Sequence, residues 1–399
     1  YDMLNVVTGP DGVAVFDGLP RAVGCSYTVA ETLRPGWEPD TLVGMATVTF
    51  DGRPPAVDPR HVLRRAVEAW ERMGLAPQLS CELEFYLLER SRPTGQPPRL
   101  ACCPRTGRPP TSPNVYGLDE LDNFAELFRE ITEAAEIQGI PCDTILTEHG
   151  PSQFEINYSY TDVVSAADQI QLYKLICRQI ATKMGFTACF LPKPVVGVNG
   201  SGMHTNVSIS QNGTNLFWDE NGEEQLSAFG WQFVDRILTH ANDICLILNS
   251  SVNAYRRLDP HYEAPNQIKA SAVDRGSMVR IPIGNARSMR VEVRSVGPDA
   301  NPYLVLYSLF RTGLEGEIAE VENLRQAERY LPDNIYDAIE NFRKSAWTTK
   351  LLGEDVKARF ADLKQASADR CPRLLGTFVK TPEVQYHHEV YNQYLWSLF

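Results

Sequence analysis

A glycine-rich segment that runs directly into an alternating strand pattern constrains this chain most. Three glycines fall within six positions, namely Gly197, Gly200 and Gly202. Such a segment favours a loop that other backbone can approach closely and whose N–H groups can hold an anion. From Met203 onward polar and apolar residues alternate, so His204, Asn206 and Ser208 share one face of a predicted strand. Taken alone, the pattern also fits a surface turn before a half-buried strand.

Three further predicted strands carry charge on one face and apolar residues on the other. In the first, Glu82 and Glu84 alternate with Leu83 and Phe85. A single strand of this kind is usually a solvent-exposed face. If the charged faces of all these strands converge, however, they enclose a cavity with one imidazole, several guanidinium groups and at least five carboxylates. The charged residues concerned are Glu82, Glu84, Glu148, Glu155, Arg290, Glu292 and Arg294.

Carboxylates cannot share a cavity without countercharge, because like charges a few ångströms apart repel and favour protonation. Divalent cations remove this conflict, and oxygen ligands with one imidazole suit Mg²⁺ or Mn²⁺ better than structural zinc. Arginines in the same cavity need an anion to face. Metal, arginine and a glycine-rich loop together suit phosphoryl transfer. The residues alone therefore indicate a metal-dependent enzyme that acts on a nucleotide phosphate, with the phosphoryl acceptor left open.

Composition excludes several other classes of protein. The net charge of −12 argues against a nucleic-acid-binding protein, and 43% hydrophobic residues over 399 positions support a sizeable core. No apolar run approaches the ~18 residues of a membrane span, and no signal peptide is visible. The nine cysteines include no C-x-x-C pair, so we expect reduced thiols in a cytoplasmic protein. The first residue is Tyr1, and we expect the natural N-terminus to lie upstream.

The order of predicted elements favours an α+β fold with largely antiparallel strands and helices outside the sheet. Periodicity predicts helices over residues 59–74, 119–138, 165–185 and 224–249, and four or five helical segments throughout the part after Asn301. Residues 250–276 are expected to be irregular. The strands of the first 58 residues would form a small separate domain.

Several motifs, in order along almost the whole chain, resemble the glutamine synthetase family. They are Cys81-Glu-Leu-Glu-Phe85, Gly150-Pro-Ser-Gln-Phe-Glu155, Asn199-Gly-Ser-Gly-Met-His204, Asn253-Ala-Tyr-Arg-Arg257, Arg290-Val-Glu-Val-Arg294 and Asn301-Pro-Tyr-Leu304. The resemblance implies an incomplete N-terminal β-grasp domain over residues 1–56. It also implies a catalytic domain over residues 57–399, shaped as a funnel of antiparallel strands flanked by helices. Homo-oligomeric rings, with a dodecamer expected, would place active sites between subunits.

The resemblance also implies a role for individual residues. Two or more divalent cations, Mg²⁺ or Mn²⁺, would be bound, one by Glu84, Glu148 and Glu155 and the other by Glu82, His204 and Glu292. The co-substrate ATP would lie near Asn206, Ser208, Arg280, Arg287 and Arg290. Glutamate would contact Asn199, Gly200, Arg257 and Arg294. Arg275 would stabilise the transferring phosphoryl group, Glu263 would take a proton from the incoming nitrogen, and Asp2 would bind the amine.

The implied reaction has two steps. The glutamate γ-carboxylate attacks the γ-phosphate of ATP, and an amine then displaces phosphate from γ-glutamyl phosphate. The chain departs from the family pattern on the amine side, because Leu146 and Thr147 precede Glu148 where true glutamine synthetases often have two histidines, and no Gly-Ser-Ser follows Asp2. We therefore expect a small organic amine as acceptor, with ammonia as the alternative. A non-catalytic structural or regulatory ring protein of the same fold is the alternative of a different class.

Overall fold

The computed structural model describes residues 5–8, 14–17, 25–29, 34–50, 55, 57–90, 97–110, 115–258 and 264–369. A sheet of ten strands forms its centre. The main path runs through β14 (Gln267–Ser271), β15 (Ser277–Arg280), β16 (Val291–Val293), β12 (Met203–Gln211), β7 (Leu75–Glu89), β9 (Gln153–Tyr158) and β8 (Cys142–Thr147). Shorter strands extend it, with β10 (Thr161–Asp162) and β11 (Phe186–Cys189) on β7 and β13 (Thr214–Asn215) on β12. In this sheet every described pairing is antiparallel except that of β14 with β15, which confirms the predicted fold class.

Strand β7 is central because one of its faces is apolar without interruption. The buried residues of this face are Leu79, Cys81, Leu83, Phe85 and Leu87. Full burial of a large apolar side chain contributes about 1.5–3 kcal/mol, so a shift of β7 by one residue would be costly. The alternate residues, from Gln78 through Glu82 to Tyr86, are thereby held on the opposite face.

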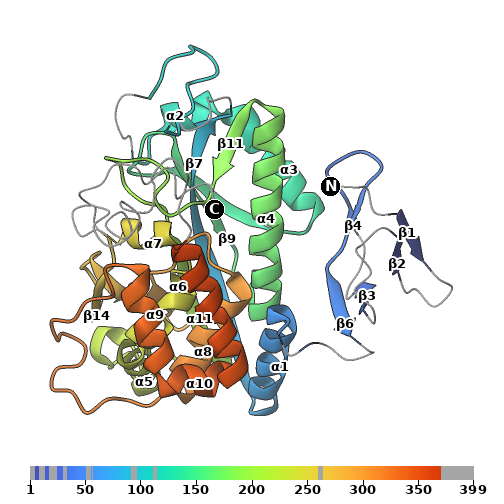
Figure 1. The fold of residues 1–399 in the computed structure, drawn as a ribbon. Helices are drawn as coiled ribbons and strands as arrows, with labels where there is room; N and C mark the ends of the chain where they lie inside the picture. The colour runs from blue at the N-terminus through green and yellow to red at the C-terminus, as the bar shows by residue number, and fades with distance from the viewer. Residues whose placement is uncertain are drawn as a thin grey trace.

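Helices cover the apolar side of the sheet. Helix α4 (Val163–Lys183) lies along β7 and β11 and also contacts α3 (Ala125–Ile137), as Figure 1 shows. A second group of helices packs together at the other end of the molecule in that view. In this group α8 (Pro302–Glu315) contacts α1 (Pro59–Arg72), α5 (Ala228–Thr239) and α6 (Ala241–Leu248). The C-terminal members are α9 (Ile335–Lys344), α10 (Ala346–Leu352) and α11 (Glu354–Ala368).

The described N-terminal strands form three antiparallel pairs beside the main sheet (Figure 1). They are β1 (Asn5–Thr8) with β2 (Ala14–Asp17), β3 (Cys25–Val29) with β6 (Ala46–Phe50), and β4 (Arg34–Pro35) with β5 (Leu42–Val43). Trp37 donates to Gln179 of α4 at 2.9 Å, and Gln138 donates to the Pro35 carbonyl at 2.7 Å. The boundary at residues 56 and 57 stays a prediction. Among the described residues, no helix has both the length and the apolar content needed to cross a membrane.

Two predicted helices are each divided in the structure. The helix predicted over residues 119–138 is α2 (Leu118–Asn123) followed by α3, with a break at Phe124, whose ring packs edge-on against Phe154 and Phe186. The helix predicted over residues 224–249 begins only at Ala228 and divides at His240 into α5 and α6. The His240 ring stacks on Trp347 and accepts from the Glu317 N–H, so tertiary contacts fix both breaks.

Two other expectations were wrong, one of them only in part. Residues 250–276, predicted to be irregular, contain helix α7 (Val252–Arg257) and strand β14. After Asn301 the described residues contain four helices, α8 to α11, which agrees with the predicted four or five segments, but residues 316–334 between α8 and α9 are not helical. The α7 segment is short, and Ser251 caps it by accepting from the Ala254 N–H at 3.1 Å. A single helical turn and a half carries too little periodicity to be recognised in sequence.

Candidate active site

Three strands, together with the residue that follows β8, bring predicted acidic residues and His204 to one side of the sheet. Pairing places His204 of β12 directly opposite Glu82 of β7, and Glu84 of β7 opposite Glu155 of β9. Side chains opposite one another across strands have Cβ atoms about 4.5–5.5 Å apart, so these pairs necessarily meet. With Glu148 they line a cavity of about 330 Å³. The convergence inferred from strand alternation is therefore present for these five residues.

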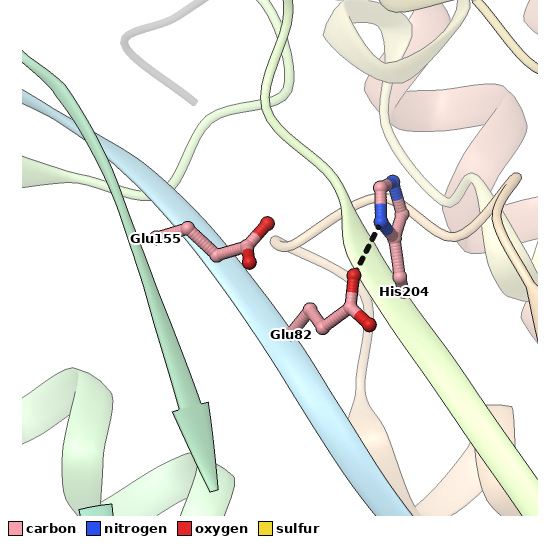
Figure 2. A group of neighbouring side chains, drawn as sticks. All are labelled: Glu82, Glu155 and His204. Carbon is pink, nitrogen blue, oxygen red and sulfur yellow. Dashed lines mark hydrogen bonds and ion pairs between the residues drawn. The ribbon is translucent and has the colours of Figure 1, made fainter. Parts of the chain in front are cut away.

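A compact donor set lies in this cavity. Glu82, Glu155 and His204 each offer a ligand atom, and these atoms all lie within 4.8 Å of one another. Figure 2 shows the three side chains pointing toward one another from β7, β9 and β12. The Glu82 Oε2 atom is 3.1 Å from His204 Nδ1, and the Glu84 Oε1 atom is 3.4 Å from His204 Nε2.

Repulsion among the buried carboxylates of this cavity favours the binding of a cation. Burial, and then the neighbouring charges of Glu84, Glu82 and Glu148, raise the pKa of Glu155 to about 10. Burial also raises the pKa of Glu148, with the Glu84 charge as the next cause. Carboxylate oxygens with one imidazole fit Mg²⁺ or Mn²⁺, and a bound divalent cation would remove this repulsion.

The side-chain positions do not divide the six predicted ligands into two separate sets. Glu155 lies opposite Glu84 and lines the same cavity as Glu148, as predicted, and its ligand atom also lies within 4.8 Å of those of Glu82 and His204. Glu292 is fully buried, does not line the cavity, and lies 2.8 Å from Arg280 Nη1 and 2.5 Å from Arg294 Nη1. Its Oε1 atom is 3.5 Å from His204 Nδ1, so Glu292 contacts the donor set without lining the cavity. The ligand roles of all six residues stay predictions.

A second, larger cavity adjoins the first. It has a volume of about 890 Å³ and shares Glu82 and Asn157 with the carboxylate cavity. Four of the five residues predicted to contact ATP line it, namely Asn206, Ser208, Arg287 and Arg290. The fifth, Arg280, lines the carboxylate cavity instead.

A chain of hydrogen bonds joins the two cavities. Arg290 Nε donates to Asn206 Oδ1 at 2.9 Å, and Asn206 Nδ2 donates to Glu82 Oε1 at 2.9 Å. Burial acts to raise the pKa of Glu82, but the hydrogen bonds from His204 and Asn206 lower it to about 2. Glu82 is therefore held as a carboxylate at the boundary between the cavities.

The residues predicted to contact glutamate gather on the carboxylate cavity. Asn199, Gly200, Arg257 and Arg294 all line it, as does Arg275. Arg257 donates to the main-chain oxygens of Arg294 at 2.9 Å and Val296 at 3.3 Å, and burial lowers its pKa to about 10. A Cβ on Gly200 would lie 2.6 Å from Arg257 Cγ, so glycine permits this approach. Asp2 and Glu263 lie outside the described residues.

Sequence reasoning missed several residues of the site. Tyr116 and Ala264 line the carboxylate cavity, and Gln153 donates to Glu84 Oε2 at 3.2 Å, whereas Leu146, noted in the sequence on the amine side, lines this cavity as well. Gln153 and Tyr86 lie on the same strands as the predicted ligands, each two residues from one of them, so the same alternation that indicated Glu84 and Glu155 could have indicated both.

Comparison with known proteins agrees with this site. A profile of the glutamine synthetase catalytic domain matches residues 56–376. Glutamine synthetase of Thermus thermophilus is 34% identical over 336 residues, which are 80% of this chain and 73% of that protein. The Methanosarcina mazei glutamine synthetase is 32% identical over 335 residues, with the same coverage of 80% and 73%.

Solved structures share the fold. The structure of GmaS, a gamma-glutamylmethylamide synthetase, without ligand superposes with a TM-score of 0.73 at 26% identity, covering 86% of this chain and 81% of that one. A glutamine synthase homologue at 21% identity has a TM-score of 0.69, with coverage of 88% and 79%. With the profile match and the curated relatives, these findings show that this chain belongs to the glutamine synthetase family and is an ATP-dependent carbon–nitrogen ligase.

Proposed function

We propose that this ligase activates the γ-carboxylate of glutamate as γ-glutamyl phosphate and transfers the γ-glutamyl group to a small organic amine. The observation that carries the proposal is the pair of adjoining cavities with Glu82 at their boundary. A nucleotide in the larger cavity would direct its terminal phosphate toward Glu82. An amino acid in the smaller one would meet it beside the carboxylate–imidazole cluster.

Each cavity supplies the charges its substrate needs. Arg287 and Arg290 line the larger cavity and would face nucleotide phosphates. Arg257 and Arg294 line the smaller cavity and would bind the α-carboxylate of glutamate. Divalent cations held by Glu82, Glu155 and His204 would supply countercharge for the phosphate oxygens.

Two other residues would balance charge and accept a proton during the reaction. Arg275 lines the smaller cavity and would balance the charge of the transferring phosphoryl group. The acceptor amine must lose a proton before its lone pair can attack the acyl phosphate. We assign this proton to the Glu263 carboxylate. A carboxylate alone is a poor acylating agent because oxide leaves poorly, which is why phosphorylation must come first.

The cavity wall favours an alkyl amine over ammonia. Among mostly charged lining residues, Tyr116, Leu146, Ala264 and Pro265 contribute apolar surface. Leu146 pairs directly with Glu155 in the β8–β9 register, so its side chain adjoins the acidic cluster. Ammonia gains nothing from such surface, whereas an alkyl group gains about 0.8 kcal/mol per buried CH₂. The similarity to GmaS supports the same acceptor class.

The decisive experiment is phosphate release from ATP with glutamate and Mg²⁺ or Mn²⁺, across ammonia and a series of primary amines. We expect turnover with an alkylamine to exceed turnover with ammonia, with the γ-glutamylamide identified by mass spectrometry. Ammonia far better than every amine would instead indicate a glutamine synthetase. Absence of turnover with all acceptors would favour the structural or regulatory alternative. Glu263→Ala, which removes the proposed proton acceptor, serves as the control.

We also propose that the chain assembles into homo-oligomeric rings in which a neighbouring N-terminal domain completes each site. The family assignment supports this proposal, and the open carboxylate cavity is compatible with closure by a second subunit. Light scattering coupled to size-exclusion chromatography would measure the assembly. A monomer that turns over at full rate would contradict it.

A further inference from the structure

Three main-chain carbonyl groups of the glycine-rich loop accept hydrogen bonds from side chains outside it or at its start. Ser201 N–H donates to the Pro192 oxygen at 2.7 Å and closes the loop. Within it, three consecutive main-chain oxygens each accept from a side chain: Val198 from Lys193 Nζ, Asn199 from the Tyr86 hydroxyl at 2.6 Å, and Gly200 from Gln153 Nε2 at 3.0 Å. Three fixed carbonyls in succession determine the orientation of the peptide planes between them.

Two of the three donors come from the sheet itself. Tyr86 and Gln153 are direct partners in the β7–β9 register, two residue pairs beyond Glu84 and Glu155. Both are buried, with 0% and 1% of their surface exposed. Gln153 is fixed at both ends of its amide, because its Oε1 accepts from the Gly150 N–H at 2.8 Å while Nε2 serves the loop. Their positions therefore follow from strand pairing.

Gly150 makes room for both donors. A Cβ on Gly150 would lie 1.8 Å from the Tyr86 hydroxyl oxygen and 2.6 Å from Gln153 Oε1. Any side chain at this position would displace the two groups that hold the loop. The glycine in the Gly150-Pro-Ser-Gln segment is thus required by a close approach and not by its backbone angles, since its φ is not positive.

We propose that Tyr86 and Gln153 are positioning residues for the amino-acid substrate. In a trans peptide the N–H points opposite to the carbonyl, so a carbonyl of Asn199 held by Tyr86 turns the Gly200 N–H away from Tyr86. Asn199 and Gly200 both line the carboxylate cavity, where this N–H would be available to glutamate. The inference rests on the proposed function, which assigns glutamate to that cavity.

The orientation of the glycine-rich loop should not affect ATP binding. None of the described loop residues 192–202 lines the larger cavity, where ATP is proposed to bind. Loss of the Tyr86 hydroxyl leaves a carbonyl oxygen without its donor and lets the loop adopt other orientations, which glutamate binding must then reverse. The effect is expected on the KM for glutamate and not on the KM for ATP.

Tyr86→Phe tests the proposal, because it removes the hydroxyl and keeps the ring. We expect the KM for glutamate to rise roughly 3- to 10-fold, as for loss of one net hydrogen bond, with kcat and the KM for ATP within about twofold of wild type. Tyr307→Phe is the matched control, since the Tyr307 hydroxyl also donates to a main-chain oxygen, that of Leu351, at 2.7 Å, and neither residue lines either cavity. It should leave all three constants unchanged.

Hydrogen exchange followed by mass spectrometry gives a second readout. Faster exchange confined to peptides covering residues 192–202 is expected in Tyr86→Phe. If Tyr86→Phe folds poorly, Gln153→Met removes the other sheet donor and should likewise raise the KM for glutamate, with the KM for ATP within about twofold of wild type; its kcat does not enter this comparison, because Gln153 also donates to Glu84. An unchanged KM for glutamate, or equal increases for glutamate and ATP, would overturn the inference. A wild-type enzyme without glutamate-dependent phosphate release would overturn the proposed function itself.

Discussion

Replacement of Asn206 by alanine should break the hydrogen-bond chain between the two cavities and lower kcat/KM for ATP. Asn206 is buried and joins two charged groups, accepting from Arg290 Nε and donating to Glu82 Oε1, each at 2.9 Å. A hydrogen bond to a charged group contributes about 1.5–3 kcal/mol. The substitution removes two hydrogen bonds. Water from the open side of the larger cavity can replace one of them, so we expect a net loss of about one hydrogen bond to a charged group. This predicts a decrease of roughly 10- to 100-fold in kcat/KM for ATP.

The assay is steady-state phosphate release with ATP varied at saturating glutamate and amine. Asn206→Asp should be at least as impaired as Asn206→Ala, because a carboxylate cannot donate to Glu82 and repels it. Asn334→Ala is the control, since Asn334 is also buried and accepts from the N–H groups of Tyr336 and Asp337, but at the start of α9. A kcat/KM for ATP within about threefold of wild type in Asn206→Ala would refute the reasoning.

Three further outcomes are expected. Chelation of divalent cations should abolish phosphate release, and Mg²⁺ or Mn²⁺ should restore it; full activity after chelation would contradict the proposed role of the Glu82, Glu155 and His204 cluster. Asp168→Asn should lower the free energy of unfolding by about 3–5 kcal/mol in denaturant titrations, because the buried Arg60 guanidinium, 2.6 Å away, loses its carboxylate partner. Burial lowers the pKa of Lys174 to about 8 from 10.5. Between these values the unfolded chain holds more protons, so the stability of wild type relative to Lys174→Met should increase as pH rises from about 7 to about 10, and a decrease would contradict the assignment.

The part of the site that lies on strands could be predicted from sequence. Alternation of Glu82 and Glu84 with Leu83 and Phe85 requires the acids to share a face, and both apolar residues are fully buried on the other. The same reasoning placed His204 correctly on the cavity side of β12. In both cases the pattern is long enough that burial of one face determines the other.

Register and strand order could not be read from the same pattern. Nothing local indicates that His204 pairs with Glu82, or that the Glu155 carboxylate lies within 4.8 Å of both. These contacts depend on which strands are neighbours. The helix break at Phe124 likewise depends on a distant partner, the Phe154 ring 5.4 Å away. Strand β14 has only Ile268 and Ala270 as buried apolar residues, too few to mark a strand in advance.

Strand β7 explains why the separate parts of the site act together. Every second residue of the strand, from Gln78 to Tyr86, lies on its polar face and belongs to one part of the site. Gln78 and Ser80 line the larger cavity, Glu82 lies at the boundary, Glu84 lines the carboxylate cavity, and Tyr86 donates to the glycine-rich loop. At about 3.3 Å per residue this row spans roughly 26 Å.

The spacing between the proposed nucleotide and amino-acid sites is therefore set by one rigid element and not by loop conformation. Because the other face of β7 is fully apolar, a slip of one residue would place every member of the row in the core. A register shift of only part of β7 is disfavoured for the same reason, because Glu84 and Tyr86 lie on one strand and would shift together. A substitution that loosens the glycine-rich loop should accordingly weaken amino-acid binding and leave the carboxylate row in place, whereas one that disturbs the apolar face of β7 should remove both together.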